Sequence, residues 1–144
     1  MEKQRAMKKT EIFFPIEPRP KGRPRFTRYG HAYTPDVTKE YEENIRNYYI
    51  AESSDYYECA IKLELSFYLP IPKSTSKKKQ RLMEQNVIKH VKKPDVDNLC
   101  KSVCDALNGV CWRDDSMITE IISRKMYATE NNVGIHMVIR QDVE

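Results

Sequence analysis

Carboxylate side chains gather in two short segments in the second half of this chain. Asp95 and Asp97 are separated by one residue, and Asp114 and Asp115 follow Trp112 further along. Carboxylate oxygens are hard ligands that suit Mg²⁺, an ion that usually combines one or two of them with waters and a substrate phosphate. A bound ion of this kind lowers the pKa of a coordinated water and neutralises charge on a phosphoryl group. The two segments therefore indicate phosphodiester hydrolysis.

A helix over residues 97 to 108 must position the first of these acids. At about 100° per residue, Asp97, Lys101 and Asp105 form one stripe, roughly 200° away from apolar positions such as Leu99. The predicted helix therefore has a charged face and a core face. On the charged face, the ammonium group of the lysine could stabilise negative charge that develops in a transition state.

Each of these acids also has an ordinary structural explanation. An aspartate just before a helix is a common N-cap, which fits Asp95, and Asp97 with Lys101 has the spacing of a helical ion pair. Asp114 and Asp115 could form a polar turn. A calcium loop of the EF-hand type is excluded, because it would need a glycine where this sequence has a cysteine and a final glutamate where it has an alanine.

Basic residues are clustered along the chain. The 25 Lys and Arg residues exceed the 21 Asp and Glu residues by only four, but residues 19–28 contain no acid and residues 73–93 are rich in lysine. Such clusters indicate an anionic partner such as DNA, whose affinity should fall steeply with salt. For the lysines at 77–79, a solvated helix face is the alternative. The expected DNA-binding residues are Arg19, Lys21, Arg23, Arg25, Arg28, Lys77, Lys78, Lys79 and Arg81.

Three aromatic residues stand among the basic residues of the first cluster. Phe26, Tyr29 and Tyr33 could stack on unpaired bases near a DNA branch, because base stacking on aromatic rings tolerates any sequence. Simple packing against the rest of the protein is the alternative, and the sequence leaves both open.

The length predicts one small domain over residues 1–144, with residues 1–10 as a flexible basic leader. Its order is β-α-β-α-β-β, an α+β fold with a small mixed sheet and two main helices, and residues 130–132 read as a hairpin turn between the last two strands. The periodicity predicts strands at 11–17, 59–69, 118–128 and 133–140, main helices at 36–51 and 97–108, and a short exposed helix at 76–85.

The cysteines and the apolar segments indicate the cellular compartment. Four cysteines lie inside apolar segments without paired short spacings, which favours reduced and buried thiols over disulfides or a zinc site. No stretch approaches the roughly 18 apolar residues that span a bilayer, and the N-terminus lacks the apolar region of a secretory signal. We expect a cytoplasmic protein with no membrane partner.

The acidic segment resembles the signature of the RusA family of Holliday junction resolvases. That signature runs Asp-x-Asp-Asn-Leu-x-Lys, then Asp-Ala-Leu-Asn, then Trp-x-Asp-Asp, and this sequence contains every part of it between residues 94 and 118. The basic loop from Lys21 to Arg28 also resembles a branch of the family often carried by phages and prophages. The basic leader and the lysine-rich insertion at 73–93 depart from the pattern, so the contacts to a junction are not carried over.

The resemblance implies an endodeoxyribonuclease that resolves four-way DNA junctions by paired symmetric nicks, in recombination and repair. It implies that Asp95, Asp97 and Asp115 bind Mg²⁺, with Mn²⁺ as an alternative ion, and that Lys101 is the catalytic lysine. The role of Asp114 stays open. Two symmetric cuts require two sites, which a homodimer with a two-fold axis supplies.

Two other functions stay open at this point. A related metal nuclease could act on other branched DNA, such as flaps or forks. In a different class, a DNA-binding dimer without catalytic activity would use the aspartates only for capping and ion pairs.

Overall fold

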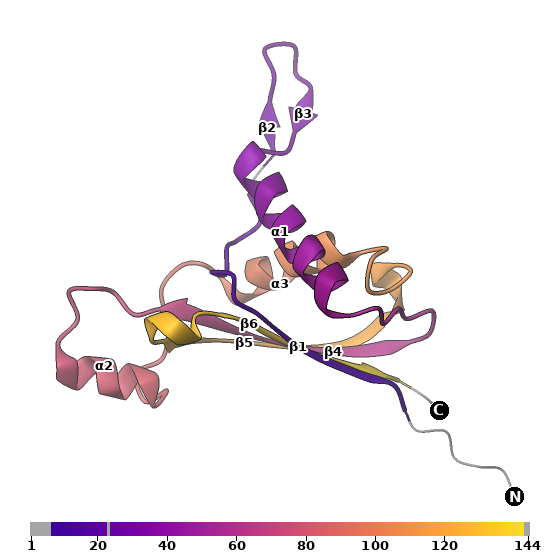
Figure 1. The fold of residues 1–144 in the computed structure, drawn as a ribbon. Coiled ribbons are helices and arrows are strands. Elements are labelled where there is room, and N and C mark those ends of the chain that lie inside the picture. Colours follow the sequence, from indigo (N-terminus) through magenta and orange to yellow (C-terminus); the bar gives the residue numbers. More distant parts are fainter. Residues whose placement is uncertain (1–6, 23, 143–144) are drawn as a thin grey trace, which may run out of the picture.

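The computed structural model describes residues 7–22 and 24–142 (Figure 1). A four-stranded sheet has the order β1-β6-β4-β5, and a separate two-stranded hairpin and three helices complete the fold. β6 pairs antiparallel with β1 and β4, whereas β5 runs parallel to β4. This mixed sheet confirms the predicted α+β class. The strands of the sheet are β1 (Lys9–Phe14), β4 (Ile61–Pro70), β5 (Ile118–Ala128) and β6 (Gly134–Gln141).

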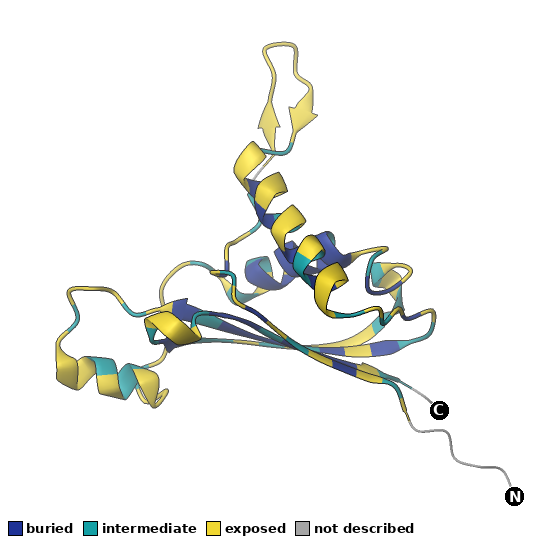
Figure 2. Ribbon diagram, in the orientation of Figure 1, coloured by how far each residue is buried: buried dark blue, intermediate teal, exposed yellow. Residues whose placement is uncertain are grey.

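Two helices cover one face of this sheet. α1 (Asp36–Glu52) and α3 (Val96–Leu107) lie together on that face, and α2 (Lys77–Glu84) lies at one end of the sheet (Figure 1). All three helices agree with the predicted ones to within a residue or two at each end. The buried residues concentrate between the two long helices and the sheet (Figure 2).

The core follows from the alternation of β4 and the periodicity of α3. Leu63, Leu65 and Phe67 on β4 are buried, and Leu99 and Val103 on α3 are fully buried against them in the same cluster. Successive side chains of a strand point to opposite faces, so β4 presents its apolar set to the helices and its polar set to the other side. The helix side therefore holds the core and fixes where α3 can lie.

The position of β6 differs from the prediction. β6 lies between β1 and β4, so it does not pair with β5, and the hairpin turn predicted at residues 130–132 is wrong. Glu130–Asn132 instead form a short 3₁₀ turn that leads the chain past β4. Ile135 and Ile139 are fully buried and Val138, on the opposite side of the strand, is also buried. A strand buried in this way suits the interior of a sheet better than an edge.

β1 begins earlier than predicted. Lys9 pairs with Arg140 of β6, and Thr10 is buried. The predicted flexible leader at residues 1–10 is therefore wrong for its last two residues, because their backbone joins the sheet. Residues 1–6 of that leader lie outside the described residues.

A short hairpin forms where the sequence predicted only a basic loop. β2 (Arg25–Phe26) and β3 (Ala32–Tyr33) pair antiparallel and project beyond the N-terminal end of α1 (Figure 1). The rings of Phe26, Tyr29 and Tyr33 are 70%, 83% and 45% exposed. Phe26 and Tyr29 are therefore largely free of packing within the chain, whereas Tyr33 is about half covered.

Two other expectations concern the cysteines and the membrane. The thiols of Cys59, Cys100, Cys104 and Cys111 are free; the last three are buried as predicted, whereas Cys59 is only partly buried. No helix in the described part of the chain is long and apolar enough to cross a membrane.

Candidate active site

The first candidate acids lie at the N-terminal end of α3. Asp95 is the N-terminal capping residue and Asp97 lies in the first turn. The carboxylate of Asp95 makes no capping hydrogen bond, and its two oxygens lie 3.1 and 3.2 Å from Nζ of Lys93, an exposed side chain. Such an exposed pair contributes little to stability. The capping explanation for this acid is therefore not supported.

The next position on the charged face of α3 is Lys101. Asp97 and Lys101 are both exposed, and within the described residues neither side chain forms an ion pair. The helical ion pair that their spacing allowed is thus not formed. Both groups remain available to an anionic substrate and its counter-ion.

A lysine from the sheet fixes the segment that leads into α3. Nζ of Lys125, on β5, donates hydrogen bonds to the carbonyl oxygens of Lys92 at 2.6 Å and Pro94 at 2.9 Å. These two bonds hold the backbone immediately before Asp95 against β5. The sheet therefore fixes the position of the backbone that leads into Asp95.

The second candidate segment is the turn after Trp112. The fully buried indole of Trp112 donates from Nε1 to Oδ1 of Asp115 at 2.7 Å. The backbone N–H of Asp115 donates to Oδ1 of Asn108 at 3.1 Å, just after α3 ends. Asp115 is thus held from both its side chain and its backbone by residues that pack with α3.

The two neighbouring acids of this turn have different roles. Oδ2 of Asp114 accepts a hydrogen bond from the backbone N–H of Ser116 at 3.0 Å and caps the short 3₁₀ helix Asp115–Met117. Hydrogen bonding from the hydroxyl of Ser116, together with this backbone bond, lowers the pKa of Asp114. Asp114 therefore acts as a helix cap, whereas Asp115 does not cap a helix.

The charge of Asp115 is only partly compensated. Burial raises the pKa of Asp115, the hydrogen bond from Trp112 lowers it, and the negative charges of Asp105 and Asp114 raise it again, with a net rise. A carboxylate with a raised pKa beside other acids gains most from a nearby cation. Asp115 is therefore the strongest candidate for binding one.

Asp97 and Asp115 both lie near enough to Cys100 to affect the pKa of its thiol. A hydrogen bond from Cys104 lowers the pKa of Cys100, and the charges of Asp97 and Asp115 both oppose that change. The described residues nevertheless contain no group of three Asp, Glu, His or Cys side chains arranged to hold a metal ion. The oxygen donors thus suit Mg²⁺ in their chemistry, while the set of three carboxylates implied by the resemblance is not assembled.

Lys21, from the first basic cluster, is used inside the protein. Its ammonium group donates to Oε1 of Glu42 on α1 and lies 3.2 Å from Oδ2 of Asp105 on α3. Burial opposes its charge, but the hydrogen bonds to both acids outweigh burial and raise the pKa of Lys21. This pairing does not support a phosphate contact; Lys21 instead joins the base of the hairpin to both helices.

Replacing Lys21 with alanine is expected to destabilise the fold. The change leaves the partly buried carboxylates of Glu42 and Asp105 without their cation, which should cost about 1–3 kcal/mol in the free energy of unfolding. Urea denaturation measures the loss. The matched control is Lys39→Ala, at an exposed position on α1, which should change stability by less than about 0.5 kcal/mol. Equal stability of the two variants would contradict this role.

The other expected DNA-binding residues lie in two separate regions. Arg19, Arg25 and Arg28 are exposed in and before the hairpin, and Arg23 lies outside the described residues. The exposed residues of α2 form the second region at one end of the sheet, where Ser76 caps the helix. The members of that second region are Lys77, Lys78, Lys79 and Arg81.

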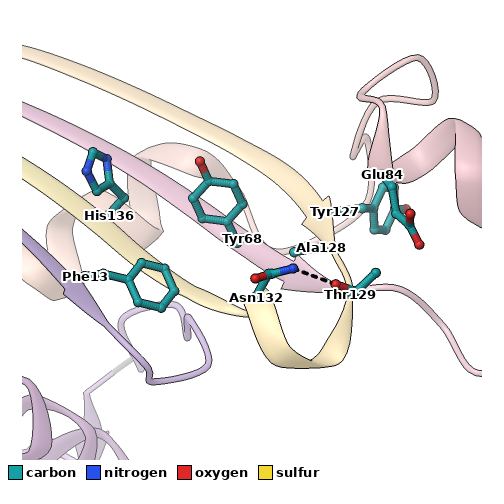
Figure 3. A pocket seen from close by; sticks show the side chains of 8 residues that line it. All are labelled: Phe13, Tyr68, Glu84, Tyr127, Ala128, Thr129, Asn132 and His136. Carbon is teal, nitrogen blue, oxygen red and sulfur yellow. Dashed lines mark hydrogen bonds between the residues drawn. The ribbon is translucent and has the colours of Figure 1, made fainter.

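A surface pocket lies away from these acids. Figure 3 shows it between the last turn of α2, the ends of β4 and β5, and the sheet face opposite the helices. It contains none of the predicted site residues. The chemistry of the α3 acids, rather than the shape of this pocket, therefore identifies the candidate active site. The pocket is lined by Phe13, Tyr68, Glu84, Tyr127, Ala128, Thr129, Asn132 and His136.

Comparisons with known proteins identify the family of this chain. A Bacillus subtilis (strain 168) protein described as "Uncharacterized protein YqaN" is 38% identical over 77 residues, which cover 52% of this chain and 54% of that protein. The chain therefore spans about half the length of this relative. The family described as Endodeoxyribonuclease RusA matches residues 15–138, which include both acidic segments and the hairpin. Because this match extends over most of the chain, the protein belongs to the RusA endodeoxyribonuclease family.

Proposed function

We propose that this protein is a cytoplasmic, Mg²⁺-dependent homodimeric endonuclease that resolves four-way DNA junctions by paired nicks. Family membership supports the endonuclease class. The observation that carries the proposal further is the state of the acids on and after α3. Asp97 has no ion-pair partner among the described residues, Asp95 makes no capping hydrogen bond, and the pKa of Asp115 is raised.

These features disfavour a DNA-binding dimer without catalytic activity. In that protein the aspartates would cap the helix and pair with lysines, as Asp114 does by capping its 3₁₀ helix. Among the described residues, Asp97 forms no ion pair, and Asp95 pairs only with the exposed side chain of Lys93. Charged side chains left without structural partners beside basic surfaces are typical of a site that meets its charged partner in the substrate complex. The acids on and after α3 therefore fit a catalytic role better than a purely structural one.

A divalent ion would be held by Asp97 and Asp115, with Asp95 as a further oxygen donor. When bound, the ion would activate a water and neutralise charge on the phosphoryl oxygens. Magnesium commonly takes only one or two carboxylates and completes its shell with water and substrate phosphate. Since the three carboxylates are not assembled beforehand, the phosphate of the DNA is expected to contribute to binding of the ion. Lys101 would stabilise the developing negative charge directly.

The basic hairpin and α2 would supply most of the affinity for the DNA backbone. Phosphate neutralisation is independent of sequence and strongly dependent on salt. A homodimer is proposed because one acidic site makes one nick, while resolution of a junction needs two symmetric nicks.

A single gel assay tests this function. Labelled synthetic four-way junctions, forked and flapped DNA and linear duplexes are incubated with the purified protein in Mg²⁺, in Mn²⁺ or in EDTA. Paired symmetric nicks on the junction, with metal only, are the expected result. Preferential cutting of forks or flaps would replace the junction with another branched substrate, and binding without any nick would favour the non-catalytic alternative.

Replacing Asn108 with alanine tests how Asp115 is positioned. Loss of the amide acceptor frees the backbone N–H of Asp115, and a displacement of about 1 Å in a catalytic group can lower the rate by roughly 100-fold. We expect single-turnover cleavage to fall by about 10- to 100-fold, while the free energy of unfolding falls by about 1 kcal/mol. Asn131→Ala, at an exposed position in the 3₁₀ turn before β6, is the control. Equal rates for both variants would remove Asn108 from the site.

A further inference from the structure

The hairpin formed by β2 and β3 exposes aromatic rings that the fold does not use. Phe26 and Tyr29 are each at least 70% exposed, and Tyr33 is 45% exposed. Single exposed apolar residues are common on protein surfaces, but several gathered on one projecting element usually mark a binding surface. We propose that this hairpin is an arm that stacks its rings on unpaired bases at the branch point of the DNA substrate, an inference that rests on the proposed function.

The charge around the rings identifies the chemistry of the partner. Arg19, Arg25 and Arg28 are exposed in and before the hairpin, and residues 18–35 contain no Asp or Glu. A surface that combines cations with flat apolar rings suits a partner that combines anionic groups with flat apolar faces. Unpaired nucleotides have both, since the phosphate meets the cation and the base meets the ring. Paired duplex offers the phosphates but keeps its base faces stacked inside.

The register of the hairpin determines which aromatic ring is accessible to a base. Phe26 lies directly opposite Ala32, and Arg25 lies opposite Tyr33. Residues directly opposite each other on an antiparallel pair share a face. One face therefore presents a phenylalanine beside a methyl group that cannot cover it, and the other presents an arginine beside a tyrosine. A base can reach the first face and a phosphate the second.

The turn holds this arrangement in place. The backbone N–H of Thr27 donates to the carbonyl of His31 at 2.8 Å, and the N–H of Gly30 donates back to the carbonyl of Thr27 at 2.9 Å. The N–H of His31 also donates to Oγ1 of Thr27 at 3.1 Å. Gly30 adopts a φ of 82°, which residues other than glycine rarely adopt. Tyr29 is thus fixed at the tip of an ordered turn.

The base of the arm is attached to the helix that carries the acids. Lys21 pairs with Glu42 on α1 and with Asp105 on α3. The hairpin also projects from the side of the sheet on which α1 and α3 lie (Figure 1). A branch point bound by the arm would therefore lie on the α3 side of the sheet, which would place cleavage near the crossover.

Binding without metal tests the arm separately from catalysis. A four-way junction carrying 5-iodouracil at the branch point is bound to the full chain in EDTA and irradiated, because this base crosslinks to aromatic rings stacked on it. We expect the crosslink to lie at Phe26 or Tyr29 by mass spectrometry. We expect Phe26→Ala with Tyr29→Ala to lower junction affinity by about 10- to 100-fold and to leave affinity for linear duplex unchanged.

Two further variants serve as controls. Phe26→Tyr keeps a ring and should keep the preference for the junction, and Tyr56→Ala, at an exposed ring outside the hairpin, should leave it unchanged. A double variant that keeps both the crosslink yield and the junction preference would overturn the proposal. If the double variant binds junctions with normal affinity and still nicks them, the arm proposal is wrong but the nuclease proposal stands. If the wild-type protein crosslinks but never nicks, the nuclease proposal is wrong but the arm proposal stands.

Two other partners would also give exposed rings, and each has its own outcome. If the double variant changes the sedimentation from dimer to monomer, the arm contacts a second copy of the chain and the proposal is wrong. If the wild-type chain binds vesicles of anionic phospholipid and the double variant does not, the arm binds a membrane surface, and the proposal is again wrong. The expected result is unchanged sedimentation and no difference in vesicle binding.

Discussion

Replacing Asp115 with asparagine is expected to abolish DNA cleavage while junction binding persists. The amide can still accept the hydrogen bond from Trp112, but it removes the negative charge that would hold the metal ion. A loss of about 4 kcal/mol of transition-state stabilisation corresponds to roughly a 1000-fold lower single-turnover rate. Asp97→Asn is expected to give a similar loss. Cleavage of a labelled junction in Mg²⁺ measures the rate, and a gel shift in EDTA measures binding.

The stability of the Asp115 variant should move in the opposite direction to its activity. Folding raises the pKa of Asp115, so the folded state favours the protonated form. The ionised carboxylate therefore lowers the stability of the fold relative to its protonated form. Asp115→Asn should therefore melt at the same or a higher temperature than the wild type. A variant that lost activity because it unfolded would melt at a lower temperature.

The matched control for both acids is Glu64→Gln. Glu64 lies on β4, on the sheet face away from the helices, and pairs with Arg124 and Arg140. This variant loses a carboxylate far from α3 and should keep normal cleavage. If Asp97→Asn and Asp115→Asn also cleave normally, the assignment of the active site to α3 is wrong.

Replacing Lys101 with alanine should lower turnover by about 100- to 1000-fold, the range found when one preorganised donor to a transition-state charge is removed. Junction binding should persist, because one phosphate contact fewer changes the slope of log affinity against log salt by less than about 1. Metal binding should also persist, since an ammonium group is not a ligand. Single-turnover rates on the synthetic junction, compared with those of Lys62→Ala on the opposite sheet face, measure the effect.

An unchanged single-turnover rate would return Lys101 to a merely structural role. Lys101→Arg separates the two roles further. Arginine keeps the charge but presents it through a planar fork, so it should restore only part of the rate. Full restoration would indicate that the field of the cation matters more than its position.

The helices and the strand that carry the core could be predicted because their signals are local. The spacing of Leu99 and Val103 on α3, and the alternation of Leu63 and Leu65 on β4, depend only on the pitch of each element. The order of the strands in the sheet could not be predicted in the same way. β6 follows β5 by a short connection, yet it pairs with β4 and β1, and such pairing depends on contacts between distant segments.

The acids of the candidate site could be found from the sequence, but not their partners. The spacing of Asp97 and Lys101 allowed an ion pair that the structure does not form. Trp112 and Asn108 stand inside the recognised pattern, but the direction of an indole N–H or of a side-chain amide is decided by packing. Nothing in the sequence indicated that Lys125 would bind the backbone before α3, because a lysine in a strand usually points to solvent.

Lys21 shows why charge clusters alone mislead. In the sequence it belongs to a run of cations without acids, so it was expected to contact phosphate. Its two carboxylate partners come from helices that are distant in the sequence, and only the packing of α1 against α3 brings them to it. For the aromatic residues beside it, the sequence left both base stacking and packing open. The exposure of Phe26 and Tyr29 argues against packing within the chain, whereas Tyr33 is about half covered.

The parallel pairing of β4 with β5 governs how this nuclease can vary. Parallel neighbours need a connection that travels the whole length of the sheet before it returns, and here that return path, residues 71–117, carries every candidate catalytic residue. The two hydrogen bonds from Lys125 to carbonyl oxygens hold this connection in place just before α3. The length of the lysine-rich stretch upstream is therefore not set by the pairing of the strands. We therefore expect that residues 71–91 can be shortened or lengthened without moving the acids of α3.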